Sequence, residues 1–250
     1  MLDILKKATP LLLLAPIAQA EVLKQSTSVS VGWNHEMGDK SEASNKFSQP
    51  VLALAHLTQA DWGTVFVGGQ IDNIGQMQDD VSGNPGSQSF KAYTTLNYNL
   101  GDSGFKLWYD GFAVGSLAMF EMTNYLGLTY AKSFGKLRAS ASLGGNYVFG
   151  HAGTSDNQVQ GFESMAYRLT ANYRFNKHWS AFAKLDGHFN RSDDYQNTYR
   201  YQDSGKSLNT GVRYDFSNGQ RITLNYGYRD SWAGYNEGGN FIRLSYGYQF

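Results

Sequence analysis

The chain has 250 residues, with no Cys, 28 Gly, 4 Pro and 15% aromatic residues. The lack of Cys excludes a disulfide-stapled fold and a Cys-ligated metal or iron–sulfur site. Lys plus Arg and Asp plus Glu number 21 each, so the basic footprint of a nucleic-acid-binding protein is missing. A mean hydropathy of −0.44 excludes a protein built of helical membrane spans, each of which needs about 20 consecutive apolar residues.

Residues 1–20 have the organisation of a secretory signal peptide. Lys6 and Lys7 supply a positive start, residues 11–18 form an apolar core too short to span a bilayer, and residues 18–20 (Ala-Gln-Ala) fit a cleavage site. The predicted mature chain is therefore residues 21–250. Export of a chain without Cys fits the envelope of a Gram-negative bacterium, where it folds without an oxidant.

After residue 21, apolar and polar side chains alternate with a period of two, which is typical of β-strands. In the last segment Ile242, Leu244 and Tyr246 share one face, while Arg243 and Ser245 share the other. Each such segment is near the ~10 residues that a tilted strand needs to cross an outer membrane. Twelve segments are predicted, at residues 25–35, 48–58, 62–72, 88–99, 105–115, 120–133, 136–149, 163–176, 178–190, 205–216, 220–231 and 240–250. The first three segments alternate less cleanly, so their register stays undetermined, most of all in the second, where both faces are apolar.

The connections between segments alternate between short and long. Long polar joints follow the odd-numbered segments, except for the short joint at 115–119, and short joints follow the even-numbered ones. The short joints are residues 58–61, 101–104, 134–136, 176–178 and 217–220, and the long ones are residues 35–46, 73–87, 151–161, 191–204 and 231–239. Short turns on one rim and long loops on the other are typical of an outer-membrane barrel with both termini in the periplasm.

A soluble β-sandwich also alternates, so the pattern alone does not say which face meets water. Three features favour a membrane barrel: aromatic residues cluster at strand ends, the polar face has few Lys or Glu, and the chain ends in an aromatic residue, Phe250. The predicted fold is all-β, a transmembrane antiparallel up-and-down β-barrel of twelve strands in the bacterial outer membrane. It would contact lipid and lipopolysaccharide, and its last strand would be read by the barrel-assembly machinery through Phe250.

Strand parity predicts which side chains face the lumen. Arg there can pair with a carboxylate or phosphate, and inward rings suit a flat heterocycle or a sugar. The alternative for the charges is a structural network of neutralised neighbours, and for the rings a filled, narrow barrel. A basic excess on one wall predicts an anion-tolerant lumen. The predicted solute-binding residues are Phe66, Trp108, Asp110, Phe112, Arg168, Phe182, Lys184, Arg213 and Arg243.

Enzyme signatures are missing from the sequence. The five His residues are scattered, and there is no HExxH motif, Gly-rich phosphate loop or metal-ligand spacing. The expectation is therefore a protein that is not an enzyme and that has no cofactor and no metal site.

Several stretches resemble the Tsx-like nucleoside-specific channel family, which includes the OmpK-type proteins. Residues 60–63 (Ala-Asp-Trp-Gly) lead into Phe66, residues 90–107 resemble a strand pair with a short polar turn, and residues 112–149 contain a T-N-Y-L-G run at 123–127 followed by F-G-K. Residues 212–215 (Val-Arg-Tyr-Asp) and the closing strand also fit. The similarity covers most of the mature chain, as pattern more than identity.

The resemblance implies a monomeric twelve-stranded channel with a narrow, flattened lumen that passes nucleosides. In some members of the family the outer loops serve as phage receptors. Two alternatives remain. The Arg-rich wall favours a channel for acidic sugars or oligosaccharides, and the Tyr- and Asp-rich loop at residues 191–204 favours a barrel that acts as a surface receptor or adhesin.

Overall fold

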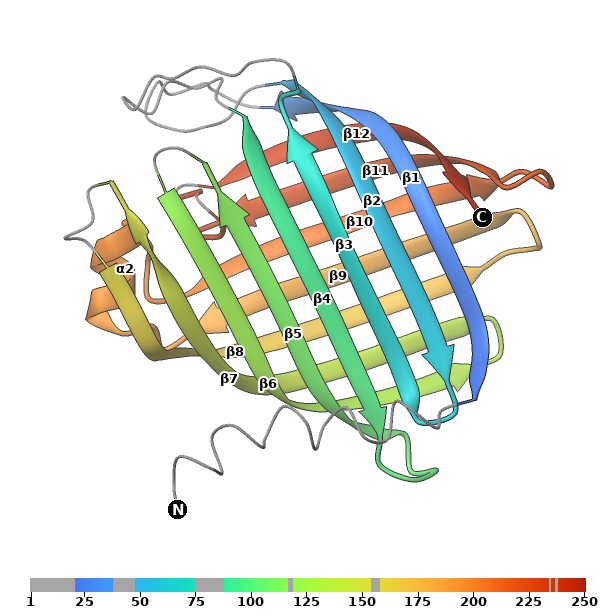
Figure 1. Ribbon diagram of the computed structural model, residues 1–250, viewed down its shortest axis with the longest axis horizontal. Helices are drawn as coiled ribbons and strands as arrows, with labels where there is room; N and C mark the ends of the chain where they lie inside the picture. Colours follow the sequence, from blue (N-terminus) through green and yellow to red (C-terminus); the bar gives the residue numbers. More distant parts are fainter. Residues whose placement is uncertain are drawn as a thin grey trace.

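The computed structural model describes residues 21–37, 48–74, 88–116, 119–153, 158–233, 235–236 and 238–250. Within these ranges twelve antiparallel strands form a closed barrel, in which each strand pairs with its neighbours in sequence and β1 pairs with β12 (Figure 1). The strands are β1 (Val22–Met37), β2 (Gln49–Ala60), β3 (Gly63–Asp72), β4 (Ser89–Asn99), β5 (Phe105–Gly115), β6 (Met119–Phe134), β7 (Leu137–Ala152), β8 (Gln158–Arg174), β9 (Trp179–Phe189), β10 (Gly205–Asp215), β11 (Gln220–Asp230) and β12 (Gly239–Gln249). The predicted all-β fold and strand number are confirmed.

The two faces of the sheet divide the side chains as the alternation predicts. Apolar side chains point outward and are exposed, whereas buried polar side chains point into the lumen. The outward apolar residues include Val31, Leu54, Leu126, Leu143, Leu169, Leu224 and Leu244. Since closure pairs the backbone of every strand on both sides, an apolar exterior of this kind suits a lipid environment.

Short turns and the C-terminus lie at one end of the barrel, and the short helix α2 (Asp193–Tyr199) lies at the other (Figure 1). Gly135 and Gly219 allow two of the turns, because their φ values of 58° and 87° lie in the left-handed region that favours glycine. Exposed aromatic side chains surround the short-turn rim, as in an interfacial girdle. They are Tyr98, Phe105, Tyr173, Phe175, Trp179, Phe216, Tyr248 and Phe250.

The structure settles the register of β2, which the sequence left undetermined. Val51 pairs with the lumen residue Asp72 and is buried, whereas Leu54 is exposed on the outer face. Most of the first two long joints, residues 38–47 and 75–87, lies outside the described residues, as do the predicted signal peptide and residues 117–118 and 154–157. Of the helices that the structure describes, none is long and apolar enough to cross a membrane.

Candidate functional site

Within the part of the chain that the structure describes, two adjoining hollows lie in the lumen. The upper hollow, of about 320 Å³, lies toward the α2 rim, and the lower hollow, of about 300 Å³, lies toward the short turns. Both are lined by Phe66, Thr95, Arg168 and Lys184, so the two meet at this level, which we call the neck. A solute that passes along the barrel has to pass these four side chains.

All nine predicted residues lie on the lumen face of their strands. Phe66, Asp110, Phe112, Arg168, Lys184 and Arg243 line the upper hollow, and Trp108 lines the lower one. Phe182 and Arg213 lie together nearer the short turns, with the guanidinium carbon 5.5 Å from the ring centroid. The structure thus brings seven of the nine around the two hollows and separates the remaining pair.

Arg168 forms the centre of a charge network at the neck. Its Nη1 and Nη2 donate to the two carboxylate oxygens of Asp110, at 2.7 and 2.6 Å, and its Nε donates to Asp186. The Arg168 side chain is only 11% exposed, as expected for a guanidinium fork held by two carboxylates. Arg168 is therefore part of a structural network of neutralised charges, which was the alternative that the sequence left open for the lumen charges.

Lys184 differs from Arg168 although both reach the neck. Its Nζ lies 3.0 Å from Asp186, but its side chain is 43% exposed. Because a partly exposed ion pair is screened by water, Lys184 is held more weakly by Asp186 than Arg168 is, and its side chain borders both hollows.

The upper hollow has an excess of basic side chains. Lys91, Arg168, Lys184, Arg229 and Arg243 line it, against Asp110 and Asp186. Lys91 is paired with Asp72 behind the lining, and Arg168 and Lys184 are paired with Asp110 and Asp186, so the excess lies in Arg229 and Arg243.

Arg229 and Arg243 are held without carboxylates. Arg243 donates from Nε to Asn34 Oδ1 at 2.5 Å and from Nη1 to Gln70 Oε1 at 3.1 Å. Arg229 lies 4.6 Å from the centroid of the Phe241 ring, and its Nη1 has no hydrogen-bond partner among the described residues. No ion pair joins either Arg to a carboxylate within the part of the chain that the structure describes. We call Arg229 and Arg243 the basic wall.

Two aromatic rings stack on the part of the upper hollow's lining that β3 and β4 form. The centroids of Phe66 and Tyr93 are 5.7 Å apart and their planes differ by 14°. Tyr93 was missed in the sequence, although it shares the parity of Lys91, which lies two residues before it on β4. The pair presents an aromatic surface to the same space as the basic wall.

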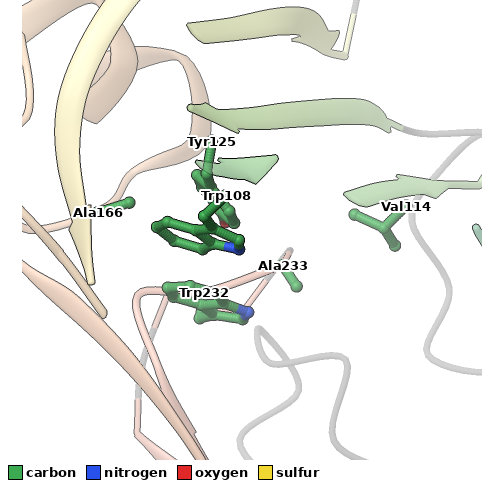
Figure 2. Packing of buried hydrophobic residues seen from close by; sticks show 6 residues of the cluster. All are labelled: Trp108, Val114, Tyr125, Ala166, Trp232 and Ala233. Carbon is green, nitrogen blue, oxygen red and sulfur yellow. The ribbon is translucent and has the colours of Figure 1, made fainter. Parts of the chain in front are cut away.

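Trp108, by contrast, is not open to a solute. Its side chain is 1% exposed and packs with Tyr125 and Trp232, as Figure 2 shows. The guanidinium of Arg168 lies 5.5 Å from its ring centroid. The ring therefore fills space beside the neck.

The segment between β9 and β10 folds inward, although the sequence predicted an exposed polar loop. Helix α2 begins after Ser192, whose Oγ accepts a hydrogen bond from the backbone N–H of Tyr195 at 3.1 Å. Tyr195 and Tyr201 donate to the two carboxylate oxygens of Glu121 on β6, at 2.5 and 2.7 Å. Tyr199 donates to the backbone oxygen of Phe120 at 2.7 Å. These three tyrosines form the inner, buried surface of the loop. Strand parity could not predict them, because they lie outside the strands.

Burial and the neighbouring negative charge of Glu121 raise the pKa of Tyr195 well above its usual value. The phenol therefore stays protonated and continues to donate to Glu121 through neutral and mildly alkaline pH.

Arg191 joins this loop to the loop between β11 and β12. Its Nη2 donates to the backbone oxygen of Ser231 at 2.6 Å, and its Nη1 donates to the backbone oxygen of Gln202 at 2.9 Å. The guanidinium also lies between the rings of Tyr195 and Tyr201, at 5.2 and 4.8 Å from their centroids. We call this set of contacts the loop latch.

The second loop carries Trp232 into the lumen. Its ring centroid lies 4.3 Å from that of His188, and it packs beside Trp108 (Figure 2). The two loops thus cover the part of the lumen beside β5 to β9. The upper hollow remains open along the basic wall.

Among the described residues no group of three or more His, Cys, Asp or Glu side chains is placed to hold a metal ion.

No protein-family model matches the chain, and no curated protein matches it. Solved structures do. The NanC porin aligns with a TM-score of 0.55 at 11% identity, over 89% of this chain and 98% of that chain. The KdgM porin, solved in complex with disordered oligogalacturonate, aligns with a TM-score of 0.53 at 11% identity, over 89% and 99%. An outer membrane channel from Pseudomonas putida F1 aligns with a TM-score of 0.53 at 12% identity, over 92% and 97%.

At such identities the similarity shows the fold, a small barrel of the outer-membrane type. With its apolar exterior, this barrel belongs in the bacterial outer membrane. The resemblance to Tsx-like channels is supported as far as this fold, and nucleoside specificity is not supported by these comparisons.

Proposed function

We propose that the protein is a passive outer-membrane channel for small anionic solutes that carry a ring, such as acidic sugars. The observation that carries the proposal is the upper hollow, where the basic side chains outnumber the acidic ones and two Arg residues are held by amides and rings rather than by carboxylates. Such guanidinium groups keep their charge available to a carboxylate or phosphate.

The geometry also suits the rest of an acidic sugar. Phe66 and Tyr93 offer an aromatic surface on which the apolar face of a sugar ring can lie, and Gln70 and Asn209 line the same hollow with amides. The structural similarity to a porin solved with oligogalacturonate is consistent with this solute class.

Nucleosides are the second candidate. The Phe66–Tyr93 stack favours them, because stacking a base on an aromatic side chain is worth about 1–3 kcal/mol. The resemblance to Tsx-like channels favours them as well. A neutral nucleoside, however, makes no use of the basic wall, which is why we place acidic solutes first.

The remaining expectations belong to the same proposal. The protein would act as a monomer without enzymatic activity, contact lipopolysaccharide on its outer rim and engage the barrel-assembly machinery through the strand ending at Phe250. The inward fold of residues 191–201 removes their tyrosines from the outer surface, which weakens the adhesin alternative for this loop. A role as a phage receptor would then fall to the other outer loops.

The test combines ion selectivity with solute uptake. In planar bilayers under a KCl gradient, the wild-type channel should prefer chloride, and Arg229→Gln combined with Arg243→Gln should move the reversal potential toward that of a non-selective pore. Lys206→Gln is the matched control, because it removes a positive charge at the same rim but on the outward face, where Lys206 packs over Tyr228.

Liposome swelling separates the solute classes. Galacturonate should enter faster than glucose, and faster than adenosine. Preferential entry of adenosine would transfer the proposal to nucleosides, and a cation-selective wild type would overturn it. A lack of any conductance would favour the receptor or adhesin.

A further inference from the structure

A third hollow, of about 170 Å³, lies in the barrel wall near the short-turn rim, among β1, β10, β11 and β12. Two guanidinium groups and four hydroxyl groups line it. They belong to Arg213, Arg221, Ser28, Ser30, Thr223 and Ser245. All six share the parity of the lumen face, so these polar groups lie at the periplasmic mouth of the lumen. Val29 and Tyr248, which also line the hollow, belong to the outward parity.

The two guanidinium groups differ in their partners. Arg221 donates from Nε to Asp215 Oδ1 at 2.5 Å and from Nη2 to Gln249 Oε1 at 2.7 Å. Arg213 forms no ion pair with a carboxylate among the described residues, and its buried Nε has no hydrogen-bond partner there. One guanidinium group at this mouth is therefore neutralised and the other is not.

Arg213 is nevertheless held in place. Its guanidinium carbon lies 5.5 Å from the centroid of the Phe182 ring, which supports the cation without occupying its N–H donors. A fixed guanidinium with unused donors beside several hydroxyl groups is the arrangement that binds a carboxylate or a phosphate.

This hollow is separate from the basic wall. On β12, Arg243 of the basic wall and Gly247 of the third hollow are four residues apart, which corresponds to roughly 13 Å along a strand. A small solute cannot hold the same charged group at both places at once.

We propose that Arg213, with the hydroxyl groups around it, forms a second oxyanion-binding site at the periplasmic mouth, where the carboxylate or phosphate of a solute binds as it leaves the lumen. The inference rests on the proposed channel function and adds an exit site to it. The basic wall then receives the anion from outside, and Arg213 receives it before release.

The test is block of single-channel current by an anion that is added to one side only. Inorganic phosphate and galacturonate serve as two separate probes, since the site fits either oxyanion. For wild type, block from the periplasmic side should be lowered by Arg213→Gln, with the half-blocking concentration rising about tenfold, as for a lost charge-assisted hydrogen bond. Block from the outer side should change less than about twofold.

Two further variants make the test specific. Arg138→Gln is the matched control, because Arg138 is the second residue of β7, at the same mouth but three strands away from Arg213 on β10, and it should leave block unchanged. Arg213→Lys keeps the charge but loses the fork and should give an intermediate value. Wild-type migration of the folded barrel on unheated gels confirms that each variant is folded.

Unchanged block in Arg213→Gln, or an equal loss in Arg138→Gln, would overturn the second site. This outcome is independent of ion selectivity. A cation-selective wild type whose phosphate block still depends on Arg213 would overturn the proposed function and leave the site standing. A response to one probe alone would assign the site to carboxylate or to phosphate.

Discussion

The two sides of the lumen use arginine differently. On the closed side, formed by β5 to β9 and the two inward loops, Arg168 and Arg191 are enclosed by carboxylates, carbonyl groups and rings. On the open side, Arg213, Arg229 and Arg243 face hollows and form no ion pair with a carboxylate among the described residues.

This difference separates two roles that composition cannot distinguish. A guanidinium held by buried carboxylates or carbonyl groups contributes to the packing and charge balance of the barrel, and its removal leaves those buried partners behind. A guanidinium that borders a hollow and forms no ion pair with a carboxylate contributes electrostatic potential to the solution in the lumen. Removing charge from the closed side should therefore change stability, and removing it from the open side should change selectivity.

The largest expected effect is on the closed side, in Arg168→Met. This change leaves the buried carboxylates of Asp110 and Asp186 without their shared cation, which costs about 3–5 kcal/mol when a buried pair loses one partner. Reversible unfolding by urea in lipid vesicles, followed by tryptophan fluorescence, measures this loss.

Arg243→Gln is the comparison on the open side. It keeps a hydrogen-bonding group near Asn34 and Gln70, so its free energy of unfolding should change by less than about 1 kcal/mol while its reversal potential shifts. Equal loss of stability in the two variants would contradict the division into a closed and an open side.

A smaller effect is expected from Arg191→Met, which breaks the loop latch. The variant loses the hydrogen bonds to Ser231 and Gln202 but keeps an apolar chain between Tyr195 and Tyr201. A hydrogen bond from a charged group contributes about 1.5–3 kcal/mol, and here the loss falls on the loops rather than on the barrel. Single-channel current should rise or fluctuate more, and residues 191–204 should be cleaved faster by protease.

Lys206→Met is the control, since it alters an outward side chain at the same rim. A current trace identical to wild type in Arg191→Met would mean that the inward loops do not limit conduction.

The barrel could be predicted from sequence because a period of two assigns each strand residue to one of two faces. Arg168 and Asp110 were both placed in the lumen in this way. Their pairing was not predictable, because it joins residues 58 positions apart on β5 and β8, which are not neighbouring strands. Parity gives the face of a side chain but not its partner on a strand that is not adjacent.

The closed side was hidden for a different reason. Residues 191–204 and 231–239 have no period, and their polar composition is the same for an exposed loop and for an inward one. Trp108 was therefore predicted as an accessible ring, whereas Trp232 from a loop covers it. The sequence also cannot show which residues of a strand face the lumen when both of its faces are apolar, as in β2.

The smallest expected effect concerns the pH dependence of the closed side. Since burial and Glu121 raise the pKa of Tyr195, the folded loop keeps this phenol protonated where the unfolded loop begins to ionise it. The stability that Tyr195 contributes is thus fully present below its ordinary pKa of about 10 and is lost as pH rises above it. Current fluctuations and protease cleavage of residues 191–204 should stay constant up to about pH 10 and increase beyond it.

Tyr195→Phe sharpens this last test, because it removes the phenol and its hydrogen bond to Glu121, at a cost of about 1 kcal/mol. Its loop should be slightly looser at neutral pH and should loosen less steeply in alkali than that of wild type. Tyr226→Phe is the control, since Tyr226 donates to Asn240 on the exposed face. If Tyr195→Phe and Tyr226→Phe show the same alkaline profile, Tyr195 does not hold the closed side in place, and the latch at Arg191 is sufficient by itself.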